Sequence, residues 1–236
     1  SRTADALGRA EQFPYRQTSE GLRYHLARIN LVQRQYDRPE EAIRELQLML
    51  EDGRYRKEAA VRYGIALAQI RADRFDEAAR TLERLLESPP RAVEFIVARA
   101  QVDINRGASA TALRRLEAAL TETPASYALN ITYAETALAL GEPATAMKRL
   151  QSFLDFRSDE PRIYQLMARA AGDQNKQAQG HAYLAEYYYR TGDMKAAILQ
   201  LEIALKRPEL NFYETSKLES RLAQFKAERD EEEEKR

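Results

Sequence analysis

The chain has 236 residues with 37 acidic and 37 basic side chains, so its formal net charge is zero. This balance argues against general nucleic-acid affinity, which needs an excess of cations. There is no cysteine, which excludes disulfides, thiol catalysis and thiolate metal sites. Gly and Pro are scarce, at 9 and 8 residues, and no apolar run approaches the roughly 18 residues of a membrane span.

The first predicted elements form the N-terminal part of an all-helical chain. A short helix over Arg2–Gln12 is followed by the extended segment FPYRQ, which begins at Phe13. Two longer helices, Ser19–Gln35 and Pro39–Glu51, then form a pair. Because the chain starts at Ser1, with no initiator Met and no secretion-signal pattern, we expect it to be part of a longer protein.

A repeated segment is the main organising feature of the sequence. Three stretches align without gaps, with a further good copy and one weaker copy. They are Ala72–Pro90, Arg106–Pro124 and Leu140–Ser158, then Arg190–Pro208 and the weaker Tyr36–Gly53. Each copy carries an alanine at the same place, and these anchor alanines are Ala42, Ala78, Ala112, Ala146 and Ala197. Their spacings are 36, 34, 34 and 51 residues, and 34 is the tetratricopeptide-repeat period.

The residue types in the repeat have a physical reason. Gly107, Gly141 and Gly192 are placed to end a first helix in the left-handed conformation. The anchor alanine five residues later is expected at the crossing of two helices, where a small side chain lets the backbones approach. Apolar residues then recur at helical spacing, and a proline ends the second helix.

The first helices of the repeats are less regular. Tyr133 and Ala134 match the large-then-small pair of the repeat, whereas Arg99 and Asp103 occupy places that are usually apolar. We therefore expect looser or shifted packing of the helix between Val93 and Gly107.

The 51-residue spacing contains one helix more than the repeat needs. We predict helices over Pro161–Ala171 and Asn175–Arg190 in this interval. After Pro208 a last amphipathic helix is expected, with Asn211 as its N-cap. Its apolar stripe consists of Leu218, Leu222 and Phe225. Terminal repeats must cover the open end of the core, so this helix is predicted to be the cap.

These elements predict an all-α tetratricopeptide-repeat superhelix of about twelve helices in one domain, 1–236. The predicted segments are the repeats 18–53, 55–90, 91–124 and 125–158, the irregular repeat 161–208 and the capping helix 209–230.

The sequence offers little for catalysis. His25 and His181 are the two histidines and lie far apart, and there is no HExxH motif and no phosphate-binding loop. We expect a non-catalytic chain with no cofactor and no metal of its own.

A partner-binding groove is predicted on the concave face, which first helices line in such solenoids. In each first helix, the residue directly after the small residue should face the groove. Residues one helical turn further on should face the groove as well. The candidate groove residues are Gln101, Asn105, Glu135, Glu186 and Tyr189. A mixed Gln and Glu row does not resemble a Lys/Arg clamp for a terminal carboxylate, so that ligand is not expected.

Both ends of the chain resemble the bacterial zinc metallopeptidase family of the β-barrel assembly-enhancing protease. Residues Ser1–Leu31 carry the resemblance at the start of the chain. It extends over nearly the whole chain and is strongest over Pro161–Phe225. Members carry an N-terminal HExxH protease and a C-terminal tetratricopeptide domain in the periplasm. The resemblance implies a periplasmic, non-catalytic module that recruits or holds outer-membrane proteins or the barrel-assembly machinery, and restrains the protease. A stand-alone scaffold or assembly factor with no protease attached is the alternative.

Overall fold

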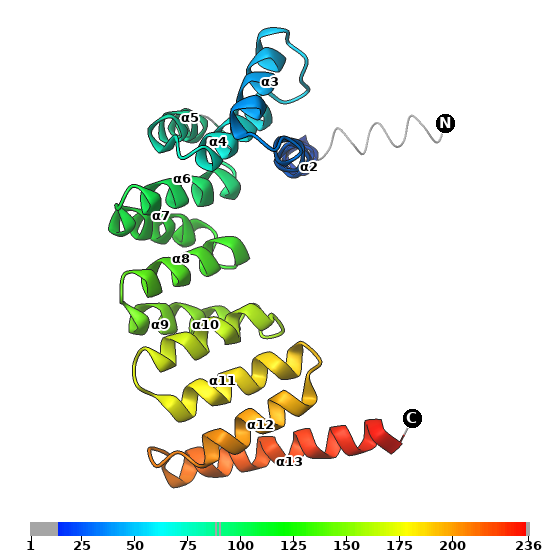
Figure 1. Ribbon diagram of the computed structural model, residues 1–236, viewed down its shortest axis with the longest axis vertical. Helices are drawn as coiled ribbons and strands as arrows, with labels where there is room; N and C mark the ends of the chain where they lie inside the picture. The colour runs from blue at the N-terminus through cyan, green and yellow to red at the C-terminus, as the bar shows by residue number, and fades with distance from the viewer. Residues whose placement is uncertain (1–13, 88, 90, 235–236) are drawn as a thin grey trace. The chain divides into compact units, whose positions relative to one another are not determined.

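The fold comes from a computed structural model that describes residues 14–87, 89 and 91–234 (Figure 1). In that part of the chain there are twelve α-helices and no strand, as the all-α prediction requires. They are α2 (Pro14–Arg34), α3 (Pro39–Glu51), α4 (Glu58–Arg71), α5 (Phe75–Glu87), α6 (Val93–Asn105), α7 (Ser109–Glu122), α8 (Tyr127–Ala139), α9 (Pro143–Leu154), α10 (Pro161–Gly172), α11 (Gln177–Arg190), α12 (Met194–Leu205) and α13 (Phe212–Glu234). The helix expected over Arg2–Gln12 lies outside the described residues.

The backbone divides into two compact units, one formed by the described residues up to Leu116 and the other by those from Glu117 onward. The division falls within α7. In the first unit α4 packs against α2, α3 and α5, and in the second unit α11 packs against α10 and α12. The predicted repeat boundaries stay predictions.

The anchor alanines behave as the repeat predicts. All of them have no exposed surface: Ala42, Ala78, Ala112, Ala146 and Ala197. Leucines one helical turn further along share the same buried face, as Leu46, Leu82, Leu116, Leu150 and Leu201 show. A larger side chain at an anchor position would have to push two close-packed helices apart.

The turn glycines adopt the predicted left-handed backbone. The φ angles are +75° at Gly107, +73° at Gly141 and +83° at Gly192. After α8, the N–H of Gly141 donates to the carbonyl of Leu138 at 3.1 Å, which closes the end of the helix. Two turns use other residues in this conformation, with φ of +56° at Asp73 and +59° at Asn175.

The divergent first helix, α6, is built around a buried ion cluster. Asp103 has 2% of its surface exposed and forms an ion pair with Arg99 one turn earlier. Glu83 of α5 accepts from Arg99 at 3.2 Å, and Arg115 of α7 places its Nε 3.5 Å from Asp103 Oδ2. The polar residues of α6 are thus accommodated by partners on both neighbouring helices, which the expectation of looser packing did not foresee.

The surplus helix is accommodated because α11 packs against both α10 and α12. On one side it pairs with α12 in the repeat anchored by Ala197, and on the other side it contacts α10. The α10 contact is close, since a Cβ placed on Gly180 would lie 3.4 Å from the carbonyl oxygen of Ala168. Figure 1 shows α10, α11, α12 and α13 as successive layers.

The N-terminal segment differs from the prediction. Helix α2 begins at Pro14, so Pro14–Gln17 is helical and not extended. Proline is favoured at the first position of a helix, because the N–H that it lacks would have no partner there. The predicted helix began at Ser19, so its first turn was missed.

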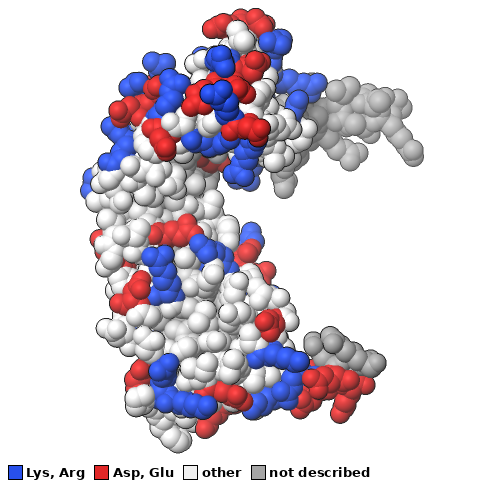
Figure 2. Space-filling view, in the orientation of Figure 1, with Lys and Arg blue, Asp and Glu red and all other residues white. Residues whose placement is uncertain are grey.

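The capping helix α13 is confirmed in detail. The Asn211 side chain accepts from the N–H of Glu214 at 2.9 Å, and the Glu214 carboxylate accepts from the N–H of Asn211 at 3.1 Å. Phe225 is fully buried against α11 and α12, with Leu218 and Leu222 packed beside it. The far end of α13 carries exposed acidic side chains, visible as a red patch in Figure 2.

Replacing Gly141 with alanine should destabilise the fold by about 1 kcal/mol, because φ is positive and only glycine adopts it without strain. No atom lies within 4 Å of the added Cβ, so a steric clash does not contribute. Urea denaturation measures the change. Gly172→Ala is the control, since that helical glycine is equally open and its replacement should be neutral or slightly stabilising. Equal losses for both variants would contradict the assignment.

Replacing Asp103 with asparagine should cost about 3 kcal/mol, because it leaves the guanidinium groups of Arg99 and Arg115 without their buried carboxylate. Glu83→Gln is the matched control, since Glu83 is 48% exposed and water can replace its contacts. The free energy of unfolding of both variants is measured in the same buffer. A loss at Asp103 no larger than that at Glu83 would contradict the special role given to the buried carboxylate.

Candidate functional site

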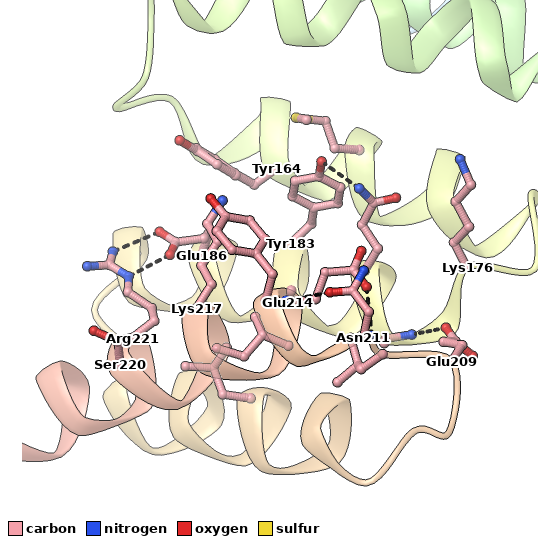
Figure 3. A pocket seen from close by; sticks show the side chains of 18 of the residues that line it. Tyr164, Lys176, Tyr183, Glu186, Glu209, Asn211, Glu214, Lys217, Ser220 and Arg221 are labelled. Atoms are coloured by element: carbon pink, nitrogen blue, oxygen red, sulfur yellow. Dashed lines mark hydrogen bonds and ion pairs between the residues drawn. The ribbon is translucent and has the colours of Figure 1, made fainter.

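A concave site in the second unit lies between α10, α11 and the first half of α13 (Figure 3). We call it the α11–α13 pocket. Its volume is about 1070 Å³, and Tyr164, Tyr183, Glu186, Lys217 and Arg221 are among the residues that line it. The surplus helix and the cap together create this space, because α13 turns back along α11 after the loop that follows α12.

Tyrosines form the aromatic part of the wall. The Tyr164 hydroxyl donates to the carbonyl of Ser158 at 2.9 Å, and the Tyr183 hydroxyl accepts from Gln179 at 3.3 Å. Burial is the main cause that raises the pKa of both phenols, so both keep their proton at neutral pH. A tyrosine wall gives a partner flat apolar faces with hydroxyl groups at their edges.

An ion cluster around Glu186 links α11 to α13 at the wall of the pocket. Glu186 of α11 forms an ion pair with Arg190 one turn later and accepts two hydrogen bonds from Arg221 of α13, at 2.7 and 2.9 Å. Figure 3 shows the two bonds between Glu186 and Arg221 side by side. A paired contact of this kind fixes the orientation of both side chains, so it sets how α13 lies against α11.

The charge state of Glu186 follows from these partners. Burial by itself would raise its pKa, but the hydrogen bonds and positive charges of Arg221 and Arg190 outweigh burial. The pKa of Glu186 therefore lies below its ordinary value of 4.5, and the cluster is charged at neutral pH.

The guanidinium groups of Arg190 and Arg221 also lie over aromatic rings. The Arg190 guanidinium lies 4.0 Å from the centre of the Tyr164 ring, and its Nη2 donates to the Tyr164 hydroxyl at 3.0 Å. The Arg221 guanidinium lies 4.4 Å from the Phe225 ring centre. Cation–π contacts of this kind add to the ion pairs and keep the arginines in place.

The loop after α12 closes the other end of the pocket. Glu209 accepts from the N–H of Ala178 at 2.5 Å and so caps α11 from a distant part of the chain. Lys176 and Lys217 also line this pocket. Neither lysine has an ion-pair partner among the described residues, so both are available to a bound acidic group.

The structure places the predicted groove residues in different settings. Glu186 lines the pocket, whereas Tyr189 stacks on Phe225 with ring centres 4.5 Å apart and belongs to the packing of the cap. Glu135 is half-buried and pairs with Arg162 of α10 at 2.5 Å. Gln101 and Asn105 are exposed on α6 in the first unit. A groove shared by all five stays a prediction.

Sequence reasoning missed Tyr183, Lys217 and Arg221 as lining residues. The helical spacing of α13 predicted the stripe that it buries, but not which part of its exposed face would lie opposite α11. Tyr183 lies three residues before Glu186, which was a usable signal because residues at this spacing share a helix face.

Chemically, the site is suited to binding. Among residues 14–87, 89 and 91–234, no three acidic or histidine side chains gather as a possible metal site. No helix in the same part of the chain has both the length and the apolar character of a membrane span.

A tetratricopeptide-repeat family model matches residues 104–170. Among curated proteins, a β-barrel assembly-enhancing protease from Yersinia pestis is 28% identical over 227 residues. The match covers 96% of this chain but 46% of that protease, so the chain spans about half the length of the relative. The chain therefore carries a tetratricopeptide-repeat match over these residues and is similar to part of that protein.

Solved structures show the same fold. A MamA fragment from Desulfovibrio magneticus superposes with a TM-score of 0.55 at 16% identity, covering 71% of this chain and 93% of that one. YrrB, described as a tetratricopeptide protein with an unusual peptide-binding site, gives a TM-score of 0.52 at 13% identity over 75% and 90% of the two chains. These likenesses confirm the predicted fold class.

Replacing Glu186 with glutamine should destabilise the second unit by about 2 kcal/mol at pH 7, because Arg190 and Arg221 lose their shared carboxylate. Since the folded pKa is lowered, this stabilisation is complete above the ordinary value of 4.5 and is lost as pH falls through the folded pKa. The difference between wild type and variant should therefore vanish in strong acid. Denaturation curves recorded across this pH range measure it.

The matched control is Glu202→Gln, which removes an exposed ion pair between α12 and α13. It should have a smaller effect than Glu186→Gln at pH 7. A difference for Glu186→Gln that stays constant down to strong acid would contradict the assigned charge state.

Proposed function

We propose that this chain is a periplasmic protein-binding module that recruits or holds outer-membrane proteins, or the machinery that assembles them, for an attached metalloprotease domain. The observation that carries the binding role is the α11–α13 pocket, with its tyrosine wall and two lysines without ion-pair partners. A site of about 1070 Å³ exceeds the space of most small-molecule sites and suits several residues of a partner chain.

The relative supports the choice of partners. The similarity to a β-barrel assembly-enhancing protease extends over 96% of the chain and includes the helices that form the pocket. The chain would act by concentrating substrates beside a protease that lies in the rest of the protein. A stand-alone scaffold or assembly factor remains the alternative, and an HExxH motif upstream of Ser1 in the gene would decide against it.

A photo-crosslinking amino acid at Tyr183 or Lys217 of the full-length protein in living cells should capture an outer-membrane β-barrel protein or a barrel-assembly component. Both positions line the pocket, so a bound partner would contact them directly. Mass spectrometry identifies the captured protein. The control position is Lys195, which is exposed on α12 and does not line the pocket.

Equal capture at Lys195 would contradict a role for the pocket. Recovery of cytosolic proteins alone would contradict the periplasmic assignment.

A further inference from the structure

A second cavity, in the first unit, has a different chemistry. It lies between α2, the end of α3, the 52–57 loop and the start of α4, and its volume is about 320 Å³. Its exposed rim carries four cations, Arg28, Arg54, Arg56 and Lys57, and none of its lining residues is acidic. We call it the α2–α4 basic pocket.

Most of the cations of this pocket have no acidic partner among the described residues. Arg54 pairs with Asp52 at 2.7 Å, and both side chains are more than half exposed. Arg28, Arg56 and Lys57 form no ion pair with any residue that the structure describes. In a chain with zero net charge, where most other clusters pair acid with base, such a local excess of positive charge favours an anionic ligand.

The floor of the pocket is apolar. Ile29, Ala60 and Val61 are buried there, and Val32 and Met49 are half-buried beside them. A cavity of about 320 Å³ has room for one or two apolar side chains. The pocket therefore fits a ligand that carries anionic groups on both sides of an apolar group.

The start of α4 has a positive helix end, which Glu58 in the first turn offsets in part while it accepts from Arg62 at 2.6 Å. Lys57 is the N-cap residue of α4 and makes no side-chain cap, so the first N–H groups of the helix are not capped by their own N-cap side chain. The positive end of a helix favours carboxylates nearby. This contribution supports the basic rim but would not identify a site without it.

We propose that the α2–α4 basic pocket binds an acidic segment of a partner protein in which an apolar side chain lies between glutamates or aspartates. Three of the four rim cations are arginines, whose planar guanidinium groups pair with carboxylates through two parallel hydrogen bonds. The apolar floor favours such a peptide over a free phosphate, which has no apolar part. This site is independent of the α11–α13 pocket.

The test uses the full chain and an unlabelled peptide of repeating Glu-Leu-Glu units, with a peptide in which Gln replaces Glu as its neutral counterpart. Titration calorimetry should detect binding of the acidic peptide alone. Its affinity should fall when salt is raised from about 0.05 M to about 0.5 M, because exposed charges are screened.

The double variant Arg28→Ala, Arg56→Ala should weaken binding about tenfold, because two of the carboxylate contacts are lost. The matched control is Arg23→Ala, Arg44→Ala, which removes two exposed arginines of α2 and α3 that do not line the pocket and should change the affinity by less than about twofold. Circular dichroism checks folding, and Arg56→Ala alone, in the loop, replaces the double variant if that fails to fold.

Three outcomes would overturn the proposal. If the Gln peptide bound as tightly as the Glu peptide, the anionic groups would not be what the site recognises. If the control variant lost as much affinity as the Arg28→Ala, Arg56→Ala variant, the peptide would not bind in the pocket. Absence of peptide binding, together with binding to vesicles of anionic phospholipid that requires Arg28 and Arg56, would assign the cations to a membrane surface.

Discussion

Close approach of helix backbones at fully buried small side chains is the constraint on which the structure depends. Ala146 and its four equivalents have no exposed surface, and each sits on the second helix of a pair. Because these positions accept only a small residue, the helices can pack closely and bury the leucine that lies one turn further along. The left-handed glycines, such as Gly141, complete the unit by reversing the chain between the two helices of a pair.

The α11–α13 pocket lies where the chain deviates from the regular repeat, at the surplus helix and the capping helix. Helix α11 contacts α10 through Gly180 and Ala168 while it also serves the repeat anchored by Ala197. Helix α13 also contacts α11, through the ion pair of Arg221 with Glu186 and the stacking of Phe225 on Tyr189. Glu186 and Arg221 then fix the separation of the two helices, so the pocket between them depends on one half-buried, charged contact.

Local features of the fold could be predicted from the sequence, because each depends on residues close together along the chain. The anchor alanines, the turn glycines and the Asn211 cap are of this kind. Contacts between distant segments could not be predicted: Asp103 finds Arg115 on the next helix, and Glu209 caps α11 from 31 residues away. For the same reason Glu186 could be chosen as a site residue while its partner Arg221 was missed. Tyr189, chosen by the same spacing rule, stacks on Phe225 because α13 covers it.

We propose above that a partner chain occupies the α11–α13 pocket. Amide hydrogen exchange of the full-length protein, with and without an unfolded outer-membrane β-barrel protein, tests it most directly, because bound segments slow the local openings that permit exchange. Binding in the pocket should add protection in α10, α11 and the first half of α13 and leave α3 and α5 unchanged. Protection confined to other helices, with exchange in α11 and α13 unaltered, would contradict it.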